Sequence, residues 1–256
     1  MKKFTDDPGY YRQAAKGSVD TGHPGMRLLK TLIKKDYKVL DLGCGEGSRL
    51  NFLVNNSSGY GIDISKNAVT KANKKYPNLK ITQSNLYKLP FKENSFHLVY
   101  SAFVIEHLEH PEIMINEARR VLIKGGIFVI IAPNYGAPNR CSPNFSGSRG
   151  RKFVIGLKND IYALFVKSEK LNWNKVMPDE GKKYFQDADT VIEPYLGSLV
   201  KYLKILGFKV TYTNSCWGEE LPSVKLHQKL FRFFALFRIY PFTYWGPHLV
   251  ISATFT

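Results

Sequence analysis

Short apolar runs alternate with helical patterns through the first half of the chain. In the helical segments, apolar side chains recur every three or four residues, which is typical of a helix with one buried face. This alternation of strand and helix predicts a mostly parallel sheet with helices on both faces, which binds ligands at the carboxyl ends of its strands. The expected strands are residues 37–42, 60–64, 79–83, 96–101 and 127–132, and the expected helices are 48–55, 66–75 and 111–124.

The chain departs from this alternation after Pro133. Residues 134–190 are expected to form an insertion, with a loop rich in Asn, Pro, Ser and Gly over 134–150 and a helix over 159–167. The pattern then predicts a helix over 191–206, two strands over 208–213 and 248–255, and an amphipathic helix over 223–238 between them.

The expected helix 223–238 carries one apolar stripe and one basic stripe, and it contains no acid. Such a helix can lie in a membrane interface. It can equally cover the substrate site and bury its stripe in the protein. The apolar stripe is Leu226, Leu230, Phe233, Phe234 and Phe237, and the basic stripe is Lys225, Lys229 and Arg232.

Length and composition allow one domain with a substantial core, because the chain has 256 residues and 44% of them are hydrophobic. The longest apolar run, residues 127–132, is far shorter than the roughly 20 residues that cross a bilayer. Cys44, Cys141 and Cys216 are widely spaced, which disfavours a disulfide framework and a zinc knuckle. We therefore expect a cytoplasmic protein, at most peripheral at the inner face of the membrane.

A net charge of +16 points to phosphate-rich or otherwise anionic partners. Residues 1–133 and 134–256 each carry +8, so no separate basic arm of the kind that binds nucleic acid stands out. Two stretches without an acid, 140–158 and 221–256, fall in the part of the chain expected to surround the substrate. The charge therefore predicts an anionic substrate or an anionic surface beside the site.

The first expected strand ends in a glycine-rich turn, VLDLGCGEG, at residues 39–47. Glycine lets a ligand approach the backbone closely, and the following helix offers free N–H groups. A dinucleotide fingerprint reads GxGxxG, and Ser48 stands where its third glycine is required, which disfavours NAD and FAD. Asp63, at the end of the second strand, is placed to accept hydrogen bonds from the two hydroxyls of a ribose.

These motifs resemble those of class I S-adenosylmethionine-dependent methyltransferases, in the broad group typified by ubiquinone and menaquinone biosynthesis enzymes. VLDLGCGEG resembles the first motif of the family and GIDIS the second, and the resemblance covers residues 25–133. It implies an α/β, Rossmann-like sheet of seven strands, mostly parallel with an antiparallel last strand. It also implies S-adenosyl-L-methionine as the cofactor and S-adenosyl-L-homocysteine as its product.

The resemblance further implies how the cofactor is held. The backbone of the glycine turn and Asp41 would meet its methionine part, Asp63 its ribose and Ile64 its adenine, while Ser101 and Phe103 would lie near the methyl group. The expected cofactor residues are Asp41, Gly43, Cys44, Gly45, Asp63, Ile64, Asn85, Leu86, Ser101 and Phe103. Where the family usually has Asp, this chain has Asn85, whose amide carbonyl can still accept from the adenine amino group.

A general base is needed only when the acceptor must lose a proton. His107 is the candidate, because its ordinary pKa of roughly 6.5 suits proton abstraction near neutrality and Glu106 could orient it. The pair could equally be a packing element at the mouth of the fourth strand. Tyr10 and Tyr11 could contact the acceptor if residues 1–24 close over the site as a lid.

No metal site is expected. Methyltransferases of polyprenyl catechols resemble this segment but carry an extra acid three residues before their Glu, which helps bind a divalent metal. Here Phe103 occupies that position, and an aromatic ring cannot ligate a hard cation.

The leading hypothesis is a single methyltransferase domain spanning residues 1–256, with a cofactor-binding core over 25–133 and a C-terminal part of the sheet over 191–256. It would transfer a methyl group to an oxygen or nitrogen of a small-molecule, lipid-linked or saccharide acceptor. One alternative acceptor is a structured RNA, which the charge favours and the absence of a recognised RNA-binding motif disfavours without excluding it. A further alternative is a regulatory protein that binds the cofactor without catalysis.

Overall fold

The computed structural model describes residues 21–55, 57–165, 170–179, 187–218 and 225–256. Tyr10 and Tyr11, and most of the expected lid over 1–24, lie outside the described residues, so their contact with an acceptor stays a prediction. Across the described ranges, no helix is long and apolar enough to cross a membrane.

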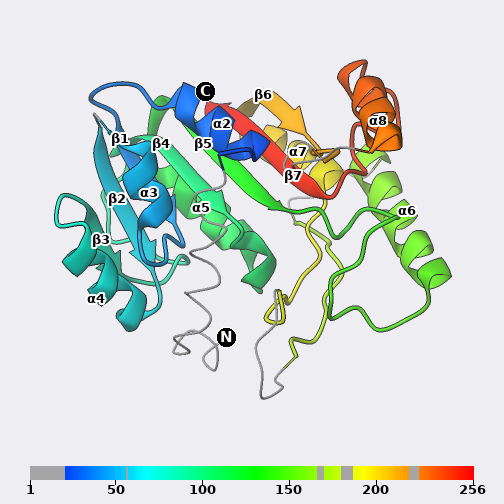
Figure 1. Cartoon of the computed structure of the whole chain (residues 1–256), viewed down its shortest axis with the longest axis horizontal. Coiled ribbons are helices and arrows are strands. Elements are labelled where there is room, and N and C mark those ends of the chain that lie inside the picture. The colour runs from blue at the N-terminus through cyan, green and yellow to red at the C-terminus, as the bar shows by residue number, and fades with distance from the viewer. Residues whose placement is uncertain (1–20, 56, 166–169, 180–186, 219–224) are drawn as a thin grey trace.

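A seven-stranded sheet forms the centre of the molecule, in the order β3-β2-β1-β4-β5-β7-β6 (Figure 1). The first five strands run parallel to one another. The last strand, β7, lies between β5 and β6 and runs antiparallel to both. The predicted mixed sheet with an antiparallel last strand is confirmed. The strands are β1 (Lys38–Leu42), β2 (Ser58–Asp63), β3 (Lys80–Gln83), β4 (Phe96–Ala102), β5 (Leu122–Pro133), β6 (Phe208–Asn214) and β7 (His248–Phe255).

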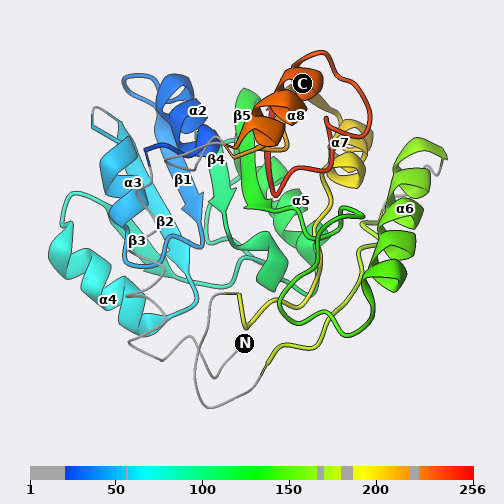
Figure 2. The same ribbon diagram turned by 45° about the vertical axis from the view of Figure 1, so that its right-hand side comes forward.

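Helices cover both faces of the sheet because alternate strand residues point to opposite sides. One core contains buried side chains of α2 (Pro24–Leu32), α3 (Ser48–Leu53) and α4 (Lys66–Lys75). The other contains those of α5 (Pro111–Val121) and α7 (Leu196–Ile205). The two views show α6 (Arg149–Phe165) at the end of the molecule opposite α4 (Figures 1 and 2). A short 3-10 turn, η1 (Ile105–His107), and α8 (Leu226–Leu236) complete the described helices.

The expected helix over 111–124 ends earlier, at Val121. Leu122 already pairs with Phe96 of β4, which draws the chain into β5 before the two glycines. The register then shifts between Phe96 and Leu98, and Gly125 supplies the positive φ of 78° in this irregular stretch. The glycine pair therefore belongs to an irregular strand and does not end the helix.

The helix expected over 159–167 begins ten residues earlier, as α6. The sequence pattern did not indicate its first part, because the buried face of this helix is largely polar. Lys152 and Asp160 point into the protein, where Lys152 pairs with Glu193 and Asp160 accepts a hydrogen bond from Tyr195. A search for apolar periodicity cannot detect such a face. The helix expected over 191–206 begins later, at Leu196, because Val191 and Ile192 instead donate backbone hydrogen bonds to the carbonyl of Glu106.

Candidate active site

The glycine turn after β1 lies at the carboxyl edge of the sheet, where it is held against the end of β2. The backbone N–H groups of Gly43 and Cys44 donate to the carbonyl of Ile62, at 2.8 and 3.0 Å. Gly43 has φ of +80°, and a Cβ added there would lie 2.5 Å from Val104. Since both of these N–H groups are engaged by β2, the turn would meet the cationic amino group of a methionine moiety through carbonyl oxygens.

Asp63 joins the glycine turn to the start of α4 with both of its carboxylate oxygens. Its Oδ2 accepts from the N–H of Gly45 at 2.8 Å, and its Oδ1 accepts from the N–H of Ser65 at 2.9 Å. The next residue, Ile64, is an exposed apolar side chain at the same edge. A carboxylate for two ribose hydroxyls beside an apolar surface for a base fits the nucleoside part of S-adenosylmethionine.

Asp41 lies below the turn and is fully buried. Its Oδ2 accepts a hydrogen bond from the hydroxyl of Tyr100 at 2.7 Å, while its Oδ1 has no hydrogen-bond partner. Burial raises the pKa of Asp41 to about 6, against the opposing charge of Arg49 and the hydrogen bond from Tyr100. Ser101 on neighbouring β4 also has a buried hydroxyl without a partner. These unpaired groups fit the amino and carboxylate groups of a bound methionine moiety.

The raised pKa of Asp41 predicts a pH-dependent cost in stability. The folded state binds this proton more tightly than the unfolded state does, so the free energy of unfolding falls as the pH rises from about 4 to about 6. Asparagine cannot ionise and escapes this loss. We therefore compare the free energy of unfolding of Asp41→Asn with that of the wild type at each pH. The variant's value minus the wild-type value should be about 1 kcal/mol larger at about pH 8 than at about pH 5.

Urea unfolding of the ligand-free protein at both pH values measures this difference. Asp36→Asn is the matched control, because Asp36 is exposed and its φ of 65° suits asparagine. Equal effects of Asp41→Asn at the two pH values would show that Asp41 is ionised normally in the folded protein.

The other residues expected to bind the cofactor differ in their exposure and in their contacts. Leu86 is buried, and Asn85 is exposed with its Oδ1 accepting from the N–H of Tyr87 at 2.9 Å. Phe103 is partly exposed with a positive φ of 58°, and its ring packs edge-on against His23 and His248. The two histidines had no signal in the sequence, because α2 and β7 meet Phe103 only in the folded chain.

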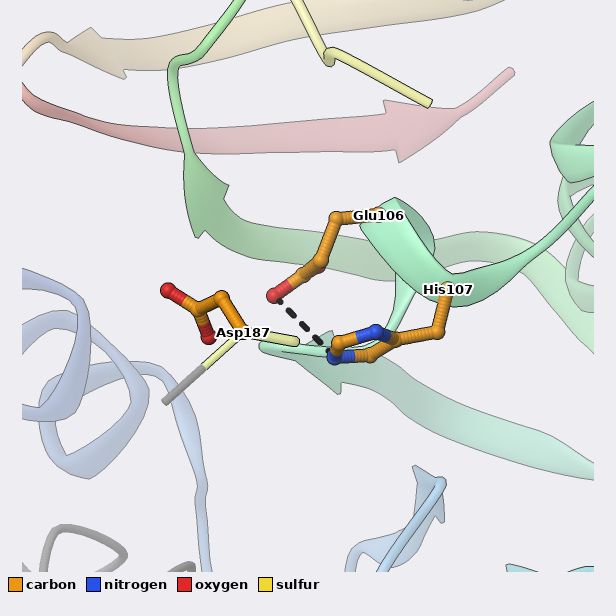
Figure 3. Close-up of side chains that lie close together, drawn as sticks. All are labelled: Glu106, His107 and Asp187. Atoms are coloured by element: carbon orange, nitrogen blue, oxygen red, sulfur yellow. Dashed lines mark ion pairs between the residues drawn. The ribbon is translucent and has the colours of Figure 1, made fainter. Parts of the chain in front are cut away.

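A second group of polar side chains, which we call the acidic cluster, lies beyond the carboxyl ends of β4 and β5. It consists of Glu106, His107, Asp187 and Asp189. The Nδ1 atom of His107 lies 3.3 Å from Oδ1 of Asp189. Its Nε2 atom lies 3.7 Å from Oε1 of Glu106 (Figure 3). Tyr135, just after β5, donates its hydroxyl to Oδ2 of Asp187 at 2.5 Å.

Burial dominates the electrostatics of the acidic cluster. It raises the pKa of Glu106 to about 7, although the nearby His107 ring lowers it. For His107, burial disfavours the charged ring, but the carboxylates of Glu106 and Asp189 outweigh it and raise its pKa above the ordinary value. Ionisation of Glu106 is therefore costly, because little water reaches its carboxyl group. The role of His107 as a base stays a prediction.

Sequence reasoning found Glu106 and His107 but missed their partners. Tyr135, Asp187 and Asp189 belong to the insertion and carry no motif that ties them to η1. The fold brings them together because Val191 and Ile192 hydrogen-bond to the carbonyl of Glu106, which docks the end of the insertion on η1. Lys152, which lies in the acid-free stretch 140–158, is buried against Glu193 and does not contribute to a basic surface.

Comparison with known proteins finds likeness in the part of the chain that contains the glycine turn and Asp63. Residues 40–130 match the family model of a methyltransferase domain. A probable S-adenosylmethionine-dependent methyltransferase of Mycolicibacterium smegmatis is 34% identical over 97 residues, covering 38% of this chain and 38% of the relative. A ubiquinone/menaquinone biosynthesis C-methyltransferase of Campylobacter jejuni is 29% identical over 113 residues, covering 41% of this chain and 48% of the relative.

The chain thus spans less than half the length of the curated relatives it matches. Solved structures extend the likeness to the whole fold. An S-adenosylmethionine-dependent methyltransferase from Mesorhizobium loti superposes with a TM-score of 0.58 at 17% identity, covering 89% of this chain and 96% of that one. The glycine turn and Asp63 lie within the matched residues, whereas Tyr135, Asp187 and Asp189 lie beyond them.

Proposed function

Because residues 40–130 form the cofactor-binding core of a class I S-adenosylmethionine-dependent methyltransferase, we propose that the protein methylates an oxygen or nitrogen atom of a small-molecule, lipid-linked or saccharide acceptor. The observation that supports this acceptor chemistry is the acidic cluster at the carboxyl ends of β4 and β5. It shares that edge of the sheet with the glycine turn and Asp63. Buried carboxylates favour an acceptor group that donates hydrogen bonds, such as a hydroxyl or an amine.

The cofactor, when bound, supplies a methyl group that is already activated by its attachment to a sulfonium. The chain's own residues would then act mainly by position, holding the acceptor atom in line with the methyl-sulfur bond. Asp63 and the glycine turn would fix the nucleoside, and Asp41 with Ser101 would fix the methionine end. The acidic cluster would orient the acceptor through hydrogen bonds.

Other acceptors stay open as outcomes of the test. The Campylobacter jejuni relative is named a C-methyltransferase of quinone biosynthesis, so a carbon acceptor is one alternative. Structured RNA is a second alternative, supported by the net charge of +16. A regulatory protein that binds the cofactor without catalysis is a third.

The test uses the purified protein with S-adenosylmethionine that carries a ¹³C-labelled methyl group, added separately to lipid, saccharide and RNA fractions. We expect the label in the lipid or saccharide fraction, with the chemical shift of a methyl group on oxygen or nitrogen. A chemical shift typical of a carbon-bound methyl group would show that the protein methylates carbon and not oxygen or nitrogen. Label confined to the RNA fraction would show that the acceptor is RNA. Cofactor binding without transfer to any fraction would favour the regulatory protein.

We also propose that α8 contacts an anionic lipid surface. Its side chains Leu226, Leu230, Phe233 and Phe237 are exposed, while Phe234, expected in the same stripe, packs against Phe242. The opposite side of the helix is anchored by Phe231, whose ring packs against Trp217. The exposed stripe therefore faces away from the protein, with Lys225 and Lys229 on the same helix to meet lipid phosphates.

Vesicle flotation tests this contact. We expect the wild-type protein to float with vesicles that contain phosphatidylglycerol. It should not float with vesicles of pure phosphatidylcholine. The double change Phe233→Ser and Phe237→Ser should abolish flotation, because it removes two interfacial anchors. Ile113→Ser is the matched control, since Ile113 is an exposed apolar residue on α5. A wild-type protein that does not float would end the proposal.

A further inference from the structure

The acidic cluster places three carboxyl groups around a single histidine ring. Glu106 is fully buried, and neither of its carboxylate oxygens has a hydrogen-bond partner. Asp189 is also buried, and its Oδ1 accepts no hydrogen bond although it lies 3.3 Å from Nδ1 of His107. Among the described residues, no lysine or arginine forms an ion pair with Glu106, Asp187 or Asp189. Buried carboxylates without partners are costly unless a cation or a proton compensates them.

The side chains converge as metal ligands do. One ligand atom each from Glu106, His107 and Asp187 lies within 4.8 Å of the other two. Atoms bound at about 2.0–2.6 Å from one ion lie roughly 3–5 Å apart, so the observed spacing requires little movement. Figure 3 shows the carboxylates of Glu106 and Asp187 directed to the same side of the His107 ring.

The surroundings of these three side chains orient them. Asp189 lies beside Nδ1 of His107, whereas Glu106 lies near Nε2. A proton on Nδ1, directed to Asp189, would leave the lone pair of Nε2 available on the side of Glu106. Tyr135 holds Oδ2 of Asp187, whose backbone adopts a left-handed conformation with φ of 62°. A non-glycine residue in that conformation is strained, and such strain persists where the surrounding structure fixes it.

We infer that Glu106, His107 and Asp187 form a binding site for a divalent cation, with Asp189 and Tyr135 orienting the ligands. Two carboxylates and an imidazole suit Mn²⁺ or Zn²⁺, and three protein ligands leave coordination positions open for a further oxygen ligand. The expectation of no metal rested on Phe103 and on the wide spacing of the three cysteines. The fold supplies the missing acid from Asp187, which lies eighty-one positions after Glu106 in the chain.

Such a cation would explain how an anionic acceptor could approach three carboxylates, and this consequence rests on the proposed function. A bound cation would attract an acceptor oxygen that the carboxylates alone would repel. It would also exclude His107 as a general base, because Nε2 would be occupied. The site itself requires only the residues of the cluster and is independent of methyl transfer.

Calorimetric titration of the EDTA-treated full chain with MnCl₂ tests the site. We expect one Mn²⁺ to bind, and the replacements Asp187→Asn and Glu106→Gln to weaken binding by at least about tenfold. Asp189→Asn should also weaken it, because His107 loses its orienting partner. Glu109→Gln, which changes an exposed acid in the same loop, is the matched control.

A second measurement guards against variants that do not fold. Mn²⁺ should raise the melting temperature of the wild type but not of Asp187→Asn, while both proteins keep the same affinity for S-adenosylhomocysteine. No Mn²⁺ binding by the wild type, or unchanged affinity in both ligand variants, would overturn the site. Methyl transfer without Mn²⁺ binding would overturn only this inference, and Mn²⁺ binding without cofactor binding would overturn only the proposed function.

Discussion

Replacing Asp63 by alanine is expected to weaken cofactor binding by about 2 to 3 kcal/mol, roughly 30- to 150-fold. The carboxylate has two functions at once. It accepts from the backbone of Gly45 and of Ser65, at 2.8 and 2.9 Å, and so fixes the glycine turn against the start of α4. It is also the group at this edge of the sheet that would accept from the ribose hydroxyls. Alanine removes both sets of hydrogen bonds.

Calorimetric titration with S-adenosylhomocysteine measures the change in affinity. Asp63→Asn separates the two functions, because the amide keeps the shape of the carboxylate but can present only one acceptor oxygen. It should therefore lose less affinity than alanine. Glu93→Ala, an exposed acid away from the turn, should bind the cofactor as the wild type does. If Asp63→Ala retained wild-type affinity, the ribose would have to lie elsewhere.

The cofactor-binding half of the fold was predictable because its signals are local. Each strand from β1 to β4 was expected within about two residues of its observed bounds. The helix expected over 66–75 is α4, and the side chain of Ser65 caps it by accepting from the N–H of Ala68 at 3.2 Å. Asp63 and the glycine turn were likewise placed correctly at one edge, since a strand followed by a glycine turn fixes where its neighbours end.

The partners of His107 in the acidic cluster were not predictable, because they depend on contacts between distant segments. Asp187 and Asp189 reach His107 only after the insertion has folded back over the ends of β4 and β5. Their sequence, Asp-Ala-Asp-Thr, is that of an ordinary polar loop. The expectation of no metal failed to consider them for the same reason, because it examined only the cysteines and positions close to Glu106 in the chain.

The insertion also misleads a search for apolar periodicity, because part of its interior is charged. Glu193 is fully buried and accepts four hydrogen bonds, from the backbone and hydroxyl of Ser142, from Lys152 and from Asn174. These donors come from the loop after β5, from α6 and from the segment before α7. One carboxylate thus connects three parts of the insertion that share no apolar pattern.

Replacing Lys152 by methionine is accordingly expected to destabilise the protein by about 3 to 5 kcal/mol. The Nζ atom lies 2.7 Å from Oε2 of Glu193, and the two side chains are 4% and 0% exposed. Burial lowers the pKa of Lys152, and the carboxylate of Glu193 opposes this shift. Each charge of the pair therefore offsets part of the cost of burying the other. Methionine fills a similar volume but leaves the carboxylate of Glu193 without its cation, which is far more costly than losing a surface ion pair.

Urea unfolding measures this loss, and the double variant Lys152→Met with Glu193→Gln identifies its cause. Because the second change removes the stranded charge, the double variant should be more stable than Lys152→Met alone. Lys158→Met, on the exposed side of the same helix, should change stability by less than about 0.5 kcal/mol. A loss below about 1 kcal/mol for Lys152→Met would mean that water reaches Glu193. The insertion would then be held by apolar packing rather than by this buried carboxylate.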